Sequence, residues 1–172
     1  MADQLSREVI DGWIDRTHPM VAEVDLFDED PVEYNFRVSN GSLAVHVIKE
    51  AADSPLLLAC RLTMGGELLE TVRDGRRDQF FGEITSVLTN TPGTHSFTDE
   101  DGQTVDQDAF TTVSLKHWIY PDGASQDELM RSIVDMMTSI AYVKQTASRI
   151  HRQVTKHQSG PQASIGWVLV RW

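Results

Sequence analysis

Eight apolar residues recur mostly at intervals of three and four positions along the last third of the chain, and this pattern predicts one long amphipathic helix. They are Leu129, Ile133, Met136, Met137, Ile140, Val143, Ala147 and Ile150. Ser125 precedes the pattern as an N-cap, and Glu128 follows three residues later, which together predict a capping box. At a rise of about 1.5 Å per residue, such a helix is long enough to cross a whole sheet. The chain must therefore supply a broad apolar surface for this helix to cover.

Apolar residues on alternate positions predict the strands of that sheet. Val32 to Val38 alternates in this way, Asn40-Gly41 then favours a tight hairpin turn, and a second strand is expected over Ser42 to Ile48. Leu56 to Leu62 is almost unbrokenly apolar, which is typical of a central strand covered on much of both faces. We interpret the acidic stretch Asp25 to Asp30, which precedes the first strand, as turn-rich.

Two further helices and two further strands complete the predicted order. The first helix is expected within Asp3 to Arg16, and a middle helical region from Leu68 to Leu88 is interrupted at Gly75. Strands are expected over Thr94 to Phe97 and over Thr111 to Tyr120. The order α-β-β-β-α-β-β-α predicts an α+β fold, in which an antiparallel sheet of about five strands carries three helices mainly on one face.

We expect a single domain over residues 1–154, followed by a C-terminal tail over residues 155–172. The apolar end of the tail carries four candidate interaction residues, which are Ile165, Trp167, Leu169 and Trp172. Its high β-propensity and low charge predict that it is paired with a strand edge or covered. It can add a strand to its own sheet or to that of a second copy. We slightly favour the second copy, which predicts a homodimer.

The segment from Ser114 to Met130 predicts a strand that ends in Ile119-Tyr120 and leads through Asp122-Gly123 into the capped helix. In this segment the chain resembles a family of uncharacterised archaeal proteins that have the fold of type III secretion chaperones. The predicted order of elements from Asp3 to Val154 resembles the same fold. The resemblance implies a chaperone-like adaptor that binds a protein partner or itself, and it assigns no catalytic or binding residue.

The charge balance indicates the kind of organism and the classes of partner to expect. The chain has 26 Asp and Glu against 15 Lys and Arg, a net charge of −11, and lysines are scarce. Such a surface is expected where high salt screens like-charge repulsion, so we expect a halophilic archaeal source. It repels phosphate backbones, which argues against nucleic-acid binding. No apolar stretch approaches the roughly 20 residues of a membrane span, and no signal-peptide pattern is present, so we expect a cytoplasmic protein that binds no membrane.

No motif in the sequence predicts a metal ion or a cofactor. The histidines are isolated, and Gly65-Gly66 lacks the Lys-Ser/Thr that follows in a phosphate-binding loop. Cys60 lies in an apolar run, which predicts a buried and inert thiol. The acidic hairpin from Asp99 to Asp108 lacks the spacing of a calcium loop, and weak cation binding there is an alternative to a solvated loop.

The leading hypothesis for function is therefore a non-enzymatic protein-interaction or chaperone-like adaptor domain. One alternative is a small-molecule sensor that uses a crevice between the sheet and the helices. Another is a cryptic hydrolase in which His117 forms an acid–base pair with Asp122 or Asp135. An exposed apolar surface favours the adaptor, whereas a deep pocket lined by His117 and carboxylates favours the alternatives.

The excess of carboxylates leads to a prediction about salt. We expect the thermal midpoint of unfolding to climb from dilute buffer to molar potassium chloride, because added salt screens repulsion among the 26 carboxylates of the compact state. Differential scanning fluorimetry across that range measures the trend. A midpoint that stays flat or falls contradicts the expectation of a halophilic protein.

Overall fold

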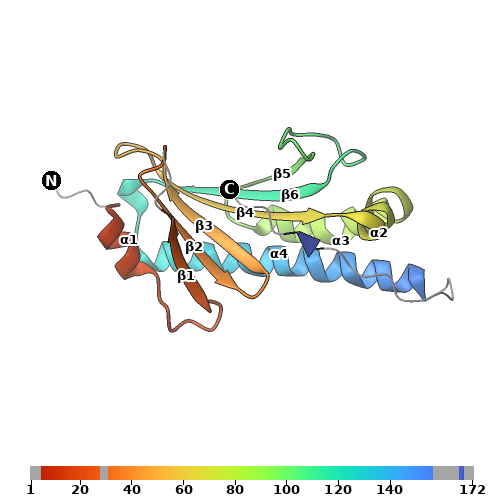
Figure 1. Ribbon diagram of the computed structural model, residues 1–172, viewed down its shortest axis with the longest axis horizontal. Helices are drawn as coiled ribbons and strands as arrows, with labels where there is room; N and C mark the ends of the chain where they lie inside the picture. The colour runs from red at the N-terminus through yellow and green to blue at the C-terminus, as the bar shows by residue number, and fades with distance from the viewer. Residues whose placement is uncertain (1–4, 28–30, 157–166, 169–172) are drawn as a thin grey trace. The chain divides into compact units, whose positions relative to one another are not determined.

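The structure is a computed structural model that describes residues 5–27, 31–156 and 167–168. Six strands form an antiparallel sheet in the order β1-β2-β3-β4-β6-β5 (Figure 1), and β7 pairs with β4 off this path. The strands are β1 (Glu23–Phe27), β2 (Tyr34–Asn40), β3 (Leu43–Lys49), β4 (Leu56–Met64), β5 (Thr94–Thr98), β6 (Thr112–Ile119) and β7 (Trp167–Val168). The helices are α1 (Arg7–Trp13), α2 (Gly66–Leu69), the π-helix η1 (Glu70–Gly75), α3 (Arg77–Asn90), the 3₁₀ turn η2 (Pro121–Gly123) and α4 (Gln126–Thr155). The predicted α+β class and antiparallel sheet are confirmed.

Neither the edge strand β1 nor the π-helical turn η1 was predicted. Strand β1 overlaps the start of the stretch interpreted as turn-rich, and its Asp25 carboxylate lies 3.2 Å from the Arg37 guanidinium on β2. The middle helical region is interrupted at Gly75 as expected, but its first part is α2 followed by a π-helical turn, in which the Arg76 amide donates to the Thr71 carbonyl. The sheet therefore has more strands, and the fold more helices, than the sequence predicted.

Packing divides the chain into two compact units, and each unit combines several stretches of sequence. The first unit contains Met1–Cys60, Pro92–Thr94 and Leu115–Thr138, and the second contains Arg61–Thr91, His95–Ser114 and Ser139–Trp172. The elements β4, β5, β6 and α4 each contribute residues to both units. The expected division into one domain over residues 1–154 and a tail over residues 155–172 stays a prediction.

In the first unit, the alternating residues of β2 and β3 form one apolar face. Tyr34, Phe36 and Val38 are buried, and Phe36 and Val38 pair with Val47 and Val45 of β3. The hydroxyl of Tyr34 donates to the Leu5 carbonyl just before α1, at 2.6 Å. This apolar face therefore lies toward α1, as one-sided helix packing on an antiparallel sheet requires.

The hairpin between β2 and β3 turns one residue later than predicted. Asn40 still pairs with Leu43, so the two loop residues are Gly41 and Ser42. Gly41 has a φ of 59°, whereas no residue other than glycine has a positive φ in the described ranges. A positive φ at the first loop position alone fits a type II′ turn, which glycine adopts without strain.

In the second unit, four phenylalanines form the centre of the core. Phe80 and Phe81 on α3 both pack with Phe110, and Phe97 of β5 packs with Phe81 and Phe110. The contacting ring centroids lie 5.0 to 6.2 Å apart. The predicted apolar face of the middle helical region thus finds its partners in the strand that follows it. Polar contacts add to this core: the Thr91 hydroxyl donates to Ser139 at 2.6 Å, and Arg149 on α4 pairs with Glu83 on α3.

Helix α4 begins and is buried as its sequence predicts. All eight residues of its predicted apolar stripe are at most 1% exposed. The Ser125 hydroxyl accepts from the Glu128 amide at 3.1 Å, which confirms the N-cap. Within the described ranges, no helix has both the length and the apolarity that crossing a membrane requires.

Replacing the N-cap tests how α4 starts. We expect Ser125→Ala to lower the free energy of unfolding by about 1 kcal/mol, because the Glu128 amide loses its acceptor. Ser86→Ala, on the exposed side of α3, is the matched control and should cause no loss. Urea unfolding of both variants measures the difference. Equal midpoints for the wild-type protein and Ser125→Ala contradict the capping role.

His46 on β3 is a buried histidine whose ring is held by its neighbours. It is 7% exposed, and its Nδ1 lies 3.1 Å from the amide oxygen of Asn35, so Nδ1 carries the proton. Arg37 is its cross-strand partner on β2. Burial lowers the pKa of His46 to about 4, and the positive charge of Arg37 acts in the same direction. His46 is therefore neutral in the folded protein at neutral pH.

This lowered pKa predicts acid sensitivity. The unfolded chain binds a proton at His46 below about pH 6.5, whereas the folded chain does so only near pH 4. The contribution of neutral His46 to the free energy of unfolding is therefore complete above pH 6.5 and is lost as the pH falls from 6.5 toward 4. We expect a loss on the order of 2 kcal/mol relative to His46→Gln over that range. Chemical unfolding at several pH values measures it, with His95→Gln on the exposed part of β5 as control. Parallel pH profiles for the wild-type protein and His46→Gln contradict this assignment.

Candidate functional site

Two large aromatic side chains are exposed at the end of β6, in the first unit. Trp118 is 39% exposed and Tyr120 is 61% exposed. Tyr120 has an extended backbone and directly precedes Pro121, where η2 begins. Because side chains two residues apart in extended chain point to the same side, the two rings lie on one face, with about 7 Å between their backbone positions.

The residues that alternate with these rings along the strand show which face the rings occupy. Leu115 and Ile119 are buried, and His117 lies 3.6 Å from Glu128 on α4, so this set of alternate residues points toward the helices. Trp118 and Tyr120 therefore point away from them. Neither ring was predicted as a site residue, although alternation with Leu115, His117 and Ile119 indicates that both lie on the opposite side of the strand.

A cross-strand row of three apolar side chains and one amide lies in the first unit, on the face opposite Tyr34. Phe27 of β1 pairs with Asn35, Asn35 with Ile48, and Ile48 with Leu57 of β4. Ile48 and Leu57 are buried, and Phe27 is half-buried. Strand β4 is next to β6, the strand that carries Trp118, in the sheet.

The connection from β6 to α4 is acidic. Between Trp118 and Met130 the sequence contains Asp122, Asp127 and Glu128 and no lysine or arginine. Asp122 and Asp127 are exposed. We call the exposed residues Trp118, Tyr120, Asp122 and Asp127, which are close together in the sequence, the aromatic–acidic surface. Their rings and carboxylates are accessible from solution.

The proposed acid–base residues do not come together as predicted. Nε2 of His117 lies 3.6 Å from the Glu128 carboxylate, and neither Asp122 nor Asp135 makes such a contact with His117 among the described residues. The hydroxyl of buried Ser132 donates to the same Glu128 carboxylate at 3.4 Å. The Ser132 hydroxyl therefore donates its hydrogen bond to a carboxylate, whereas a serine activated by a histidine base donates it to that histidine. These contacts stabilise the first turns of α4 against β6.

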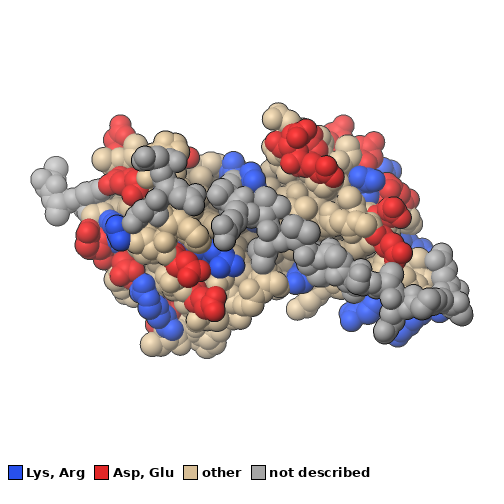
Figure 2. Space-filling model, in the orientation of Figure 1, with Lys and Arg blue, Asp and Glu red and all other residues tan. Residues whose placement is uncertain are grey.

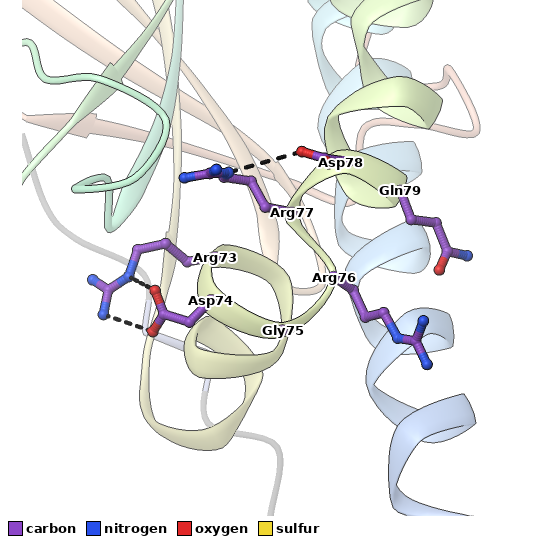
Figure 3. A pocket seen from close by; sticks show the side chains of 7 residues that line it. All are labelled: Arg73, Asp74, Gly75, Arg76, Arg77, Asp78 and Gln79. Carbon is purple, nitrogen blue, oxygen red and sulfur yellow. Dashed lines mark hydrogen bonds and ion pairs between the residues drawn. The ribbon is translucent and has the colours of Figure 1, made fainter.

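A charged hollow of about 520 Å³ lies in the second unit, where η1 meets α3 (Figure 3). Arg73 and Asp74 form a two-point ion pair at 3.0 and 3.2 Å, which holds the pKa of Asp74 below its usual value. Among the described residues, Arg76 forms no ion pair or side-chain hydrogen bond. Figure 3 shows Arg73 and Arg77 pointing to one side, and Arg76 and Gln79 pointing to the other. The side chains diverge, whereas a small-molecule site needs groups that converge on one ligand.

A second, smaller hollow of about 350 Å³ lies in the first unit between α1 and the strands β1 and β2. Arg16 and Asp11 form an ion pair across it, with 2.5 Å between the nitrogen and the oxygen, and both are half exposed. Such a pair is solvated and contributes little binding energy. Neither hollow contains His117, so the pocket that favours a sensor or a hydrolase is absent from these two sites.

The remaining candidates are the metal-ligating residue types, Cys60 and the acidic loop between β5 and β6. No group of three His, Cys, Asp or Glu in the described ranges is placed to hold a metal ion. Cys60 is buried as predicted, and burial raises the pKa of its thiol to about 12, which disfavours the reactive thiolate. On the face drawn in Figure 2, carboxylates gather over the connection between β5 and β6. There the Asp99 carboxylate accepts from the amides of Asp101 and Gln103, which closes the loop.

The predicted tail residues are described only in part. Trp167 and Val168 form β7, which pairs antiparallel with Met64 and Thr63 of β4 in the same chain. This pairing corresponds to the first of the two predicted alternatives, a strand added to the chain's own sheet. Ile165, Leu169 and Trp172 lie outside the described residues. The homodimer through this segment stays a prediction.

Comparison with known proteins identifies a shared fold. No protein-family model matches the sequence, and the curated proteins give no match. The chain is similar to a solved structure described as the crystal structure of an uncharacterized protein from Methanothermobacter thermautotrophicus. The two share 19% identity with a TM-score of 0.62, over 87% of this chain and 99% of the other. At this level of identity, the similarity shows the fold alone.

Proposed function

We propose that this chain is a non-enzymatic, adaptor-like domain that binds a protein partner through its aromatic–acidic surface. The observation that carries the proposal is the exposure of two rings at the end of β6, Trp118 within the strand and Tyr120 just beyond it. Tryptophan and tyrosine are enriched among the few residues that dominate binding energy in protein interfaces. Both rings point outward because alternation along the chain places their neighbours His117 and Ile119 on the inner side.

The alternatives have weaker support from the arrangement of side chains. A hydrolase needs a base that takes a proton from a nucleophile, and the His117–Glu128 pair is occupied with Ser132 and Arg131 in holding α4. A sensor needs an enclosed pocket with convergent polar groups, and the hollow at η1 is open and its arginines diverge. Binding at an exposed surface requires neither feature.

Selection from a displayed library of random 12-residue peptides tests this function. We expect peptides enriched on the wild-type chain to bind the double variant Trp118→Ala, Tyr120→Ala at least tenfold more weakly, a loss of about 1.4 kcal/mol or more. Tyr142→Ala is the matched control, because Tyr142 is 40% exposed but lies on α4 in the other unit. Its affinity for the same peptides should equal that of the wild-type chain.

Two outcomes contradict the proposed function. In the first, no peptide is enriched over an empty support. In the second, the double variant retains the selected peptides with unchanged affinity. Both rings are exposed, so we expect both variants to fold, and the thermal midpoint checks this directly.

A further inference from the structure

We infer that the partner of the aromatic–acidic surface is a basic segment, an exposed stretch of chain rich in arginine. This inference rests on the proposed function and names the chemistry of the partner. It follows from the combination of exposed rings and exposed carboxylates on one short stretch of chain.

The rings supply the first part of the chemistry. A guanidinium stacks on the face of tryptophan or tyrosine and is attracted by the negative charge of the ring face. Trp118 and Tyr120 point to the same side of extended chain, with about 7 Å between their backbone positions. A partner in extended conformation has the same spacing between alternate side chains, so two of its arginines can meet two rings.

The carboxylates supply the second part. Asp122 follows Tyr120 by two residues and is exposed, and Asp127 is exposed at the start of α4. Glu128 is different, because His117 and Arg131 lie 3.6 and 3.8 Å from its carboxylate. Neither Asp122 nor Asp127 has an ion-pair partner among the described residues. Each can therefore accept both hydrogen bonds of a guanidinium.

The charge of the whole chain points in the same direction. A net charge of −11 attracts cationic segments over long distances at low salt and repels acidic ones. A second copy of this chain would bring another −11 to the contact, so the surface is a poor match for itself. Arginine suits the surface better than lysine, because the guanidinium stacks on rings and pairs with carboxylates through two parallel hydrogen bonds.

Fluorescence anisotropy with three labelled 12-residue peptides tests the inference. The probes share one sequence, which alternates a charged residue with serine or leucine, and differ in having arginine, lysine or glutamate at every charged position. We expect the arginine peptide to bind the wild-type chain, the lysine peptide to bind severalfold more weakly, and the glutamate peptide not to bind.

The variants separate the surface from general charge attraction. We expect Trp118→Ala to weaken binding of the arginine peptide at least tenfold and Asp122→Asn to weaken it severalfold, while Tyr142→Ala leaves it unchanged. Trp118→Phe keeps a ring and should retain most of the affinity. Equal binding by the wild-type chain and Trp118→Ala overturns the inference, because the attraction then comes from net charge and not from this surface.

The peptide library distinguishes failure of this inference from failure of the proposed function. If the library yields ligands that depend on Trp118 but are acidic or uncharged, the surface binds proteins and the basic partner is wrong. If it yields no ligand that depends on Trp118, the proposed function itself is wrong. Enrichment of arginine among the ligands that depend on Trp118 supports both.

Discussion

The buried face of α4 is the constraint on which the rest of the structure depends. Its eight apolar residues, from Leu129 to Ile150, are excluded from solvent in both units, so each unit must present side chains that cover them. Polar residues at the border of this face then fix the register of α4. Glu128 meets His117 in the first unit, and in the second Arg149 meets Glu83 and Thr71 meets His151 at 3.0 Å.

The same constraint produces the candidate site. Strand β6 must turn Leu115, His117 and Ile119 toward the helices, because these residues are buried or contact α4. Alternation along a strand then forces Trp118 and Tyr120 to the opposite side. Exposure of two large rings is unfavourable in water, so they are unlike the isolated surface apolar residues that need no explanation. Their place beside the acidic connection to α4 gives the surface both of its chemical components.

Sequence patterns predicted the elements that have one buried face and failed where structure depends on a distant partner. The stripe of α4 and the alternation of β2 carried enough information by themselves. Strand β1 was missed because an edge strand tolerates charge: Asp25 is stabilised by Arg37, which is twelve residues away. The π-helical turn was also unpredictable, because Thr71 in that turn bonds to His151, which is 80 residues away. His117 was matched with the wrong carboxylates because Glu128 was assigned to the helix cap alone.

Salt concentration changes which groups of the proposed aromatic–acidic surface would contribute to partner binding. At the molar salt that the composition predicts, the screening length falls to about 3 Å, so attraction by the net charge of the chain no longer reaches beyond direct contact. Only groups that touch the partner then contribute, and stacking on a ring survives screening better than attraction between separated charges. At such salt the proposed surface would need rings as well as carboxylates, and the exposed Trp118, Tyr120 and Asp122 supply both kinds of group.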